Sequence, residues 1–304
     1  MDIRVGEAAA LVTAVLWTFT AICFEFAAKR IGSLSLNVLR LATALILFTT
    51  LGLVLRGELL PLAAGADVWF WLSISGLVGF VFGDLFLFQA YIDIGARLTQ
   101  VVFASAPLMT AVIGYFALGE RIGAVGLIGM VVVVSGITLV VMDRSPSAAE
   151  TAGTAALPPA RRLRGVFFGL MGALGQAGGL VLSKIGAPSS DPFVATQIRV
   201  IAGFLGFLVV AAVWKRSAEP WKALRDRRAL GMLSIGAFFG PFLGVSLGLF
   251  AVQRSSAGIA ATLMGLTPIL ILVPSVFLKK ERVSPREAAG ALIAVAGSSL
   301  LFLA

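Results

Sequence analysis

Ten apolar segments of about 20 residues follow one another through this chain, separated by short polar breaks. A helix needs about 20 mainly apolar residues to cross the hydrocarbon core of a bilayer. Only 13% of the residues are charged and 59% are hydrophobic, which leaves too few charges to cover a soluble protein. We therefore predict an all-α membrane protein with ten transmembrane helices, at residues 6–28, 34–55, 68–91, 97–118, 123–142, 164–184, 193–214, 229–251, 256–278 and 286–303.

The second half of the chain repeats the first. Several pairs share one offset of 161 residues: Gly79 and Gly240, Gly83 and Gly244, Pro107 and Pro268, Glu120-Arg121 and Glu281-Arg282, Gly129 and Gly290, Gly136 and Gly297. Because each half holds five helices, an odd number, the second half must enter the membrane from the opposite side. We therefore expect two inverted five-helix repeats, residues 1–143 and 164–304, with a site between them near the midplane, as is typical of secondary transporters.

Charge patterning predicts the orientation. The loops on one side hold seventeen Lys and Arg residues, and those on the other side hold five. The positive-inside rule places the basic side in the cytoplasm and both termini outside it, which is the periplasm in a bacterium. The net charge of +9 thus reports orientation rather than nucleic-acid binding. Residues 144–163, rich in Ala, Ser, Thr and Pro, would form a flexible cytoplasmic linker.

The residue inventory argues against catalysis and metal binding. The chain has no histidine, and its single cysteine, Cys23, excludes an intramolecular disulfide and a cysteine metal cluster. Gly244-Val-Ser246-Leu-Gly248 fits a hydrolase elbow, but it lies inside an apolar segment and lacks a histidine partner. We expect no catalytic residue, no metal and no cofactor, and therefore no enzyme.

A polar stripe inside the third segment indicates a substrate site. An ionised carboxylate such as Asp84 costs several kcal/mol within a membrane unless it meets water or a partner, so it indicates a cavity or else a structural ion pair. Two glutamines either join that cavity or bond helix to helix. The candidate substrate-cavity residues are Trp17, Thr18, Phe80, Asp84, Phe88, Tyr91, Gln100 and Gln176.

A cytoplasmic gate is the second predicted site. Glu25, Arg40 and Asp84 should lie at a similar depth in the cytoplasmic third of the membrane. We expect Arg40 to pair with one or both carboxylates and close the inner side; a static pair is the alternative. The two halves differ here: the second half repeats the arginine, because Arg199 matches Arg40 at an offset of 159, but it lacks the carboxylate, because Asp84 aligns with Val245.

Two prolines and several glycines supply the candidate moving parts. Pro107 and Pro268 lie at equivalent places inside the fourth and ninth segments, where proline removes a backbone hydrogen bond. They would act as hinges, or else as fixed bends. Glycines four residues apart, such as Gly79 and Gly83, allow helices to approach closely.

The doubled motif resembles a known family. The segment from Gly79 through Pro107 to Gly136, which recurs from Gly240 to Gly297, is similar to the signature half of the EamA, or drug/metabolite transporter, family. Leu16-Trp17 and Arg40 match that family's opening pattern. The resemblance covers nearly the whole chain and implies ten helices in two inverted repeats around a central cavity. It also implies transport of small metabolites, often amino-acid export, and among members the chain most resembles the YddG-type aromatic amino-acid exporters.

The predicted function is export of aromatic or neutral amino acids across the bacterial inner membrane by alternating access. The partners would be the small-molecule substrate and the lipid bilayer, without nucleic acid, and the protein would be a monomer or weak dimer. A lipophilic-drug exporter and a sugar-phosphate or nucleotide-sugar carrier remain alternatives, as do a lipid enzyme and a channel. A dianionic substrate is disfavoured because the two arginines within spans, Arg40 and Arg199, are expected near opposite faces. Proton coupling and facilitated diffusion stay open.

Overall fold

The computed structural model describes residues 2–119, 123–142, 158–186, 190–254, 263–278 and 283–303. Within these ranges the ordered elements are all helices, with no strand. Most of the predicted linker and the Glu-Arg pairs at 120–121 and 281–282 lie outside the described residues. Helix α7 (Pro159–Gly186) begins five residues before the predicted boundary at 164, so the end of that linker segment is helical.

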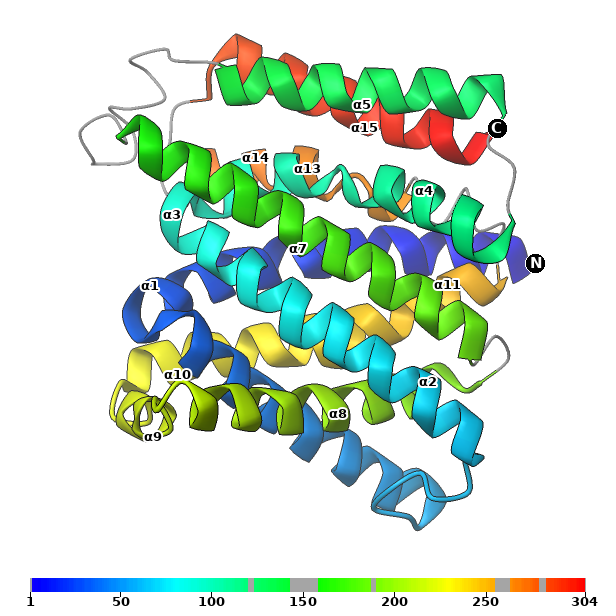
Figure 1. Ribbon diagram of the computed structural model, residues 1–304, viewed down its shortest axis with the longest axis vertical. Helices are drawn as coiled ribbons and strands as arrows, with labels where there is room; N and C mark the ends of the chain where they lie inside the picture. The colour runs from blue at the N-terminus through cyan, green and yellow to red at the C-terminus, as the bar shows by residue number, and fades with distance from the viewer. Residues whose placement is uncertain are drawn as a thin grey trace.

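The first helix, α1 (Asp2–Arg56), contains the first two predicted spans. It is interrupted at Gly32, whose backbone φ of 79° lies in the left-handed region that glycine adopts without strain. Figure 1 shows that the chain reverses direction there, so the two parts of α1 run back across the bundle. Gly95, with φ 78°, interrupts α3 (Asp84–Phe103) in the same way.

The repeat offset reappears in the helix boundaries. The helix α2 (Ala66–Gly76) continues through a π-helical segment η1 (Leu77–Gly83) into α3. Its counterpart runs from α10 (Arg227–Ala237) through η2 (Phe238–Gly244) into α11 (Val245–Arg254). Each of these segments starts 161 residues after its partner, as does α15 (Pro285–Leu303) after α5 (Ala124–Met142). Both halves therefore carry a widened π turn at the same register.

The remaining helices end and begin at identifiable signals. They are α4 (Ala106–Leu118), α8 (Pro192–Val213), α9 (Ala218–Ala223), α13 (Thr267–Leu270) and α14 (Leu272–Phe277). Asp191 caps α8 by accepting hydrogen bonds from two backbone N–H groups, at 2.8 and 3.0 Å. Pro107 and Pro268 stand in the first turn of α4 and α13, after short breaks, rather than inside continuous helices.

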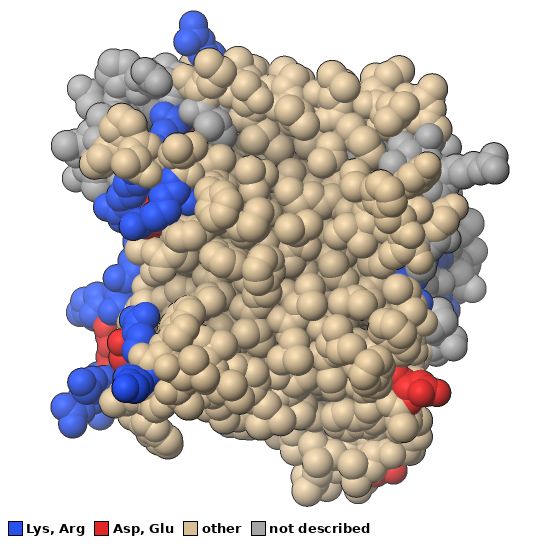
Figure 2. All heavy atoms as spheres, viewed as in Figure 1, with Lys and Arg blue, Asp and Glu red and all other residues tan. Residues whose placement is uncertain are grey.

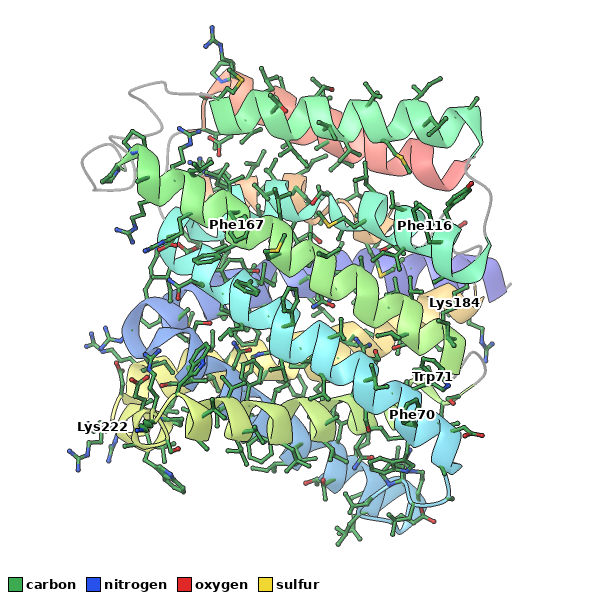
Figure 3. All side chains as sticks on the ribbon, viewed as in Figure 1. Phe70, Trp71, Phe116, Phe167, Lys184 and Lys222 are labelled. Atoms are coloured by element: carbon green, nitrogen blue, oxygen red, sulfur yellow. The ribbon has the colours of Figure 1, made fainter. Side chains whose placement is uncertain are left out.

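Within the described residues, length and composition identify five stretches able to cross a membrane: Val5–Arg56, Ala66–Phe103, Pro159–Gly186, Pro192–Val213 and Arg227–Ala251. The first holds 52 residues, enough for two crossings with the reversal at Gly32. Large apolar side chains, including Phe116 and Phe167, point outward (Figure 3). In Figure 2 a charge-free band separates the two ends of the visible face. These features define a multi-pass membrane protein.

The two ends of the bundle differ in charge. We call the end that holds α9 and Lys222 the basic end, because most of the Lys and Arg atoms visible in Figure 2 gather there. Lys184 lies at the opposite end (Figure 3), together with both ends of the chain (Figure 1).

Glycines bring the two halves into close contact. A Cβ added to Gly179 of α7 would lie 2.9 Å from the Cα of Gly79 in η1. On the other side of the bundle, a Cβ added to Gly240 in η2 would lie 3.2 Å from the hydroxyl oxygen of Thr20 in α1. The first helix of each half thus packs against the π-helical segment of the other half, with no room for larger side chains.

Candidate functional site

A buried ion pair lies at the centre of the candidate site. The Nη2 atom of Arg40 donates to the Oδ2 atom of Asp84, and each residue is 3% exposed. The second carboxylate oxygen, Oδ1, accepts from the Nε2 atom of Gln176 at 3.1 Å. The Nε atom of Arg40 donates to the Oδ1 atom of Asn37 at 3.0 Å. Asp84 is therefore bonded on both oxygens, as a carboxylate within a membrane requires.

Aromatic rings enclose the guanidinium of Arg40. Its central carbon lies 4.8 Å from the centroid of the Phe88 ring, 5.6 Å from that of Phe80 and 5.8 Å from that of Phe24. Such distances allow cation–π attraction, which strengthens when water is excluded. Phe24 and Phe88 also meet edge to face, with their centroids 5.3 Å apart. The ion pair is thus held in an aromatic surround.

A second arginine approaches the same ring. The guanidinium carbon of Arg199 lies 5.0 Å from the Phe80 centroid, so Phe80 contacts both arginines. Phe80 is the midpoint of the helical run from Ala66 to Ile94. The expectation that Arg40 and Arg199 lie near opposite faces is therefore wrong: they enter from helices of different halves and converge on a ring near the middle. Two positive charges and one negative charge meet there.

Some of the predicted cavity residues lie around the Arg40–Asp84 pair, and the others make contacts elsewhere. Tyr91 accepts a hydrogen bond from the Nε2 atom of Gln100 at 2.8 Å and lies beside Phe88, with centroids 5.5 Å apart. Thr18 donates to the carbonyl oxygen of Ala14 in its own helix, at 2.9 Å. Trp17 packs against Gly244, where an added Cβ would lie 2.7 Å from its indole Nε1. Phe80, Asp84, Phe88 and Gln176 are the members gathered around the ion pair.

A hollow of about 430 Å³ lies elsewhere. It is lined at the end opposite the basic end by residues that include Arg56, Glu58 and Asp191, and by none of the predicted cavity residues. Among the described residues no group of three or more His, Cys, Asp and Glu side chains is placed to hold a metal ion.

Glu25 lies at a different depth from Asp84. Its Oε1 atom accepts from the Nζ atom of Lys29 at 2.6 Å and lies 3.3 Å from the point where a Cβ on Gly95 would stand. Gly95 is about 16 Å along the helix from Asp84, at 1.5 Å per residue. The equal depth expected for the three gate residues is therefore wrong, and Asp84 is the carboxylate that Arg40 contacts. That pair lies within the first half and cannot by itself close one half against the other.

Within the described residues, three ion pairs with N–O distances of 3.0 Å or less join the two halves near the basic end, and sequence reasoning missed them. We call them the basic-end ion pairs: Asp93 with Arg164 at 2.7 and 2.8 Å, Arg97 with Glu287 at 3.0 Å, and Arg30 with Asp226 at 2.7 Å. Asp93 follows the predicted span by two residues, and its 2% exposure could not be read from sequence. The hydrogen bond from Arg30, with one from the backbone N–H of Ala229, lowers the pKa of Asp226.

This geometry defines a class: a helical membrane protein with two similar halves that meet at a buried charged centre, which is the architecture of a transporter rather than of an enzyme. The sequence profile of the EamA-like transporter family matches residues 4–142 and 163–303. The chain belongs to the EamA-like transporter family.

Individual relatives agree with this assignment. A Synechocystis sp. (strain ATCC 27184 / PCC 6803 / Kazusa) protein named as an uncharacterized transporter is 26% identical over 75% of this chain and 69% of its own length. A chloroplastic WAT1-related protein of Arabidopsis thaliana is 25% identical over 77% of this chain, which spans about half (54%) of that protein. A crystal structure of a protein 18% identical in sequence has the same fold, with a TM-score of 0.64 over 97% of this chain and 94% of that chain.

Proposed function

We propose that the protein exports aromatic or neutral amino acids across the bacterial inner membrane by alternating access between two inverted five-helix repeats. The observation that carries the proposal is that Arg40, paired with Asp84, and Arg199 from the other half both lie over the ring of Phe80. A charged centre at mid-membrane, walled by aromatic rings, suits a small solute with a charged head group and an apolar side chain.

Reciprocal contacts support the inverted repeat. A Cβ on Gly136 of α5 would lie 2.7 Å from the carbonyl oxygen of Gly290 in α15, and one on Gly297 would lie 2.8 Å from that of Gly129. Each member of the first contact is 161 residues from its counterpart in the second. Contacts of the form i to j and j to i arise when two similar units are related by a two-fold axis. Ten spans follow if the two parts of α1 and the two π-helical runs each cross the membrane once, and α4, α5, α7, α8, α13 with α14, and α15 supply the other six.

The basic-end ion pairs support a closed state at the cytoplasmic side. Each joins a residue before position 143 to one after position 158, so separating the halves at this end must break all three. The positive-inside rule assigns this end to the cytoplasm and the termini to the periplasm. We accordingly assign the inner gate to these pairs and the Arg40–Asp84 pair to the substrate centre.

The charge balance favours a substrate with one negative group. Asp84 already neutralises Arg40, so the centre carries one surplus positive charge, from Arg199. A lipophilic cation would be repelled, and a sugar phosphate with two charges would exceed what one free guanidinium balances. A zwitterionic or monoanionic amino acid fits better than either alternative.

Transport by purified protein tests the proposal. Proteoliposomes would be loaded with each member of a panel of amino acids, sugar phosphates and cationic drugs, and saturable counterflow of the labelled compound would be measured. We expect flux of at least one aromatic or neutral amino acid that the unlabelled compound competes away. Saturable flux of sugar phosphates or drugs with none of any amino acid would overturn the assignment. Flux with and without a pH gradient would separate proton coupling from facilitated diffusion.

A further inference from the structure

Arg199 is a buried cation that forms no ion pair with any described residue, because the nearby carboxylate of Asp84 is bonded to Arg40. The residue is 5% exposed, and its buried Nε atom has no hydrogen-bond partner within the described part of the chain. Its repeat counterpart Arg40 has Asp84 and Asn37 as partners, whereas position 245, equivalent to Asp84, is a valine. A guanidinium that is desolvated and incompletely bonded is a strong attractor for an anion.

A hydrogen-bond acceptor lies close to Arg199, at the tight contact between Gly79 and Gly179 where the two halves meet. Gly79 has no side chain, and the point where its Cβ would stand lies 3.2 Å from the Nη2 atom of Arg199. The same point lies 3.8 Å from the Oε1 atom of Gln176. Gln176 uses its Nε2 atom to bind Asp84, so its carbonyl oxygen remains an acceptor. A strong cationic donor and a neutral acceptor thus flank one glycine, beside the face of Phe80.

We propose that Arg199 binds the α-carboxylate of the substrate and that the Oε1 atom of Gln176 accepts a hydrogen bond from its α-ammonium group. The inference rests on the proposed function and names the chemical groups that this transporter reads. The carboxylate and the ammonium group of an α-amino acid are attached to the same carbon. They match the guanidinium of Arg199 and the carbonyl oxygen of Gln176, which both lie beside Gly79. The bound carboxylate would balance the surplus charge, and the amino-acid side chain would lie among the aromatic rings.

Head-group analogues test the role of Arg199. Uptake of L-phenylalanine, its amide and phenethylamine would be measured in proteoliposomes with wild-type protein, Arg199→Gln and Arg199→Lys. The wild type should prefer the acid, and Arg199→Gln should lower kcat/KM for the acid at least about tenfold while changing that for the amide little, because a lost charge-assisted bond costs the acid alone. Arg199→Lys should keep part of the preference for the acid.

A second variant covers the case in which Arg199→Gln does not fold. Gly79→Ala keeps every charge but places a methyl group 3.2 Å from the Nη2 atom of Arg199, so it should weaken uptake of the acid. Gly178→Ala is the matched control, because its methyl would meet the Cγ1 atom of Val78 at a similar 3.1 Å and lies in the same pair of helices. The control should keep the preference of the wild type.

The outcomes separate the inference from the proposed function. Equal losses for acid and amide in Arg199→Gln, or equal effects of Gly79→Ala and Gly178→Ala, would overturn the inference while leaving amino-acid transport intact. Absence of amino-acid flux in the wild type would refute the proposed function and the inference with it. A loss confined to the acid in the Arg199 and Gly79 variants would support both.

Discussion

Replacing Glu287 by glutamine tests whether the basic-end ion pairs hold the halves together. Glu287 accepts from Arg97 at 3.0 Å, and the two side chains are 6% and 12% exposed. Glutamine keeps the size of the side chain and a carbonyl acceptor but removes the charge. A hydrogen bond between charged, mostly buried groups contributes about 1.5–3 kcal/mol, so the equilibrium toward separated halves should shift by about 10- to 150-fold.

The chain carries its own reporter of that separation. Cys23 is the single cysteine, is 7% exposed, and packs with its Cβ 3.2 Å from where a Cβ on Gly236 of α10 would stand. Separating the halves at the basic end would expose its thiol. When closing is faster than the chemistry, the rate of labelling by a small maleimide is proportional to the open population. Glu287→Gln should therefore raise the labelling rate by about the same factor.

The matched control is the same substitution in a pair that does not join the halves. Glu219 bonds Arg216 at 2.6 Å, both residues lie in the second half, and their side chains are 37% and 49% exposed. Glu219→Gln should leave labelling unchanged. Equal labelling of Glu287→Gln and wild type, with both proteins folded, would refute the role of these pairs as a gate.

Three further changes probe the packing and the charges. Gly175→Ala places a methyl 2.7 Å from a backbone nitrogen of η1, so it should lower the free energy of unfolding by about 1–3 kcal/mol and lower the melting temperature in detergent. Gly231→Ala meets open space and should not lower the melting temperature. Equal melting temperatures of the two variants would contradict the close contact at Gly175. Asp226→Asn removes a carboxylate whose pKa is lowered in the folded protein. The stability that this carboxylate contributes is present above about pH 4 and is lost as the pH falls through the lowered pKa. The wild type should therefore melt at a higher temperature than the variant at neutral pH, and this difference should disappear in acid. A constant advantage in a pH series of melting curves would contradict that linkage. Arg40→Met or Asp84→Leu alone strands a buried charge and should cost about 3–5 kcal/mol in melting experiments, while the double variant should recover most of it; a double variant no better than the worse single one would contradict the pairing.

The repeating elements could be predicted from sequence because they depend on local pattern. Matching glycines and prolines at one offset predicted helix pairs that start 161 residues apart. Apolar length predicted membrane-crossing helices, and the described residues hold five stretches long and apolar enough to cross. The widened turns of η1 and η2 were not predicted, because π-helical turns are rare and the apolar pattern of these segments does not distinguish them from an α-helix. Pro107 was expected inside a helix, yet the chain breaks first and proline begins the next helix.

The candidate site was predicted only in part, because pairing depends on tertiary neighbours. Asp84 and Arg40 could be brought together by comparing their depths along neighbouring spans, and the structure pairs them. Glu25 could not, because the same comparison ignores where each helix turns. Arg199 was assigned to the wrong face for that reason, and its contact with Phe80 joins two halves whose relative placement no local pattern encodes.

The first helix of each half packs against the π-helical segment of the other half, and this arrangement has a consequence for biosynthesis. The glycine surface formed around Gly79 and Gly83 is filled by α7, which the ribosome completes only at Gly186. At about 5–20 residues per second, the interval between finishing Gly95 and finishing α7 is about 5–20 s. During that interval the nascent first half presents a bare backbone groove to lipid or to the insertion machinery. Newly made chains should therefore pass through a stage sensitive to protease and to any insertion factor that shields such grooves, and slow codons between the halves would prolong it.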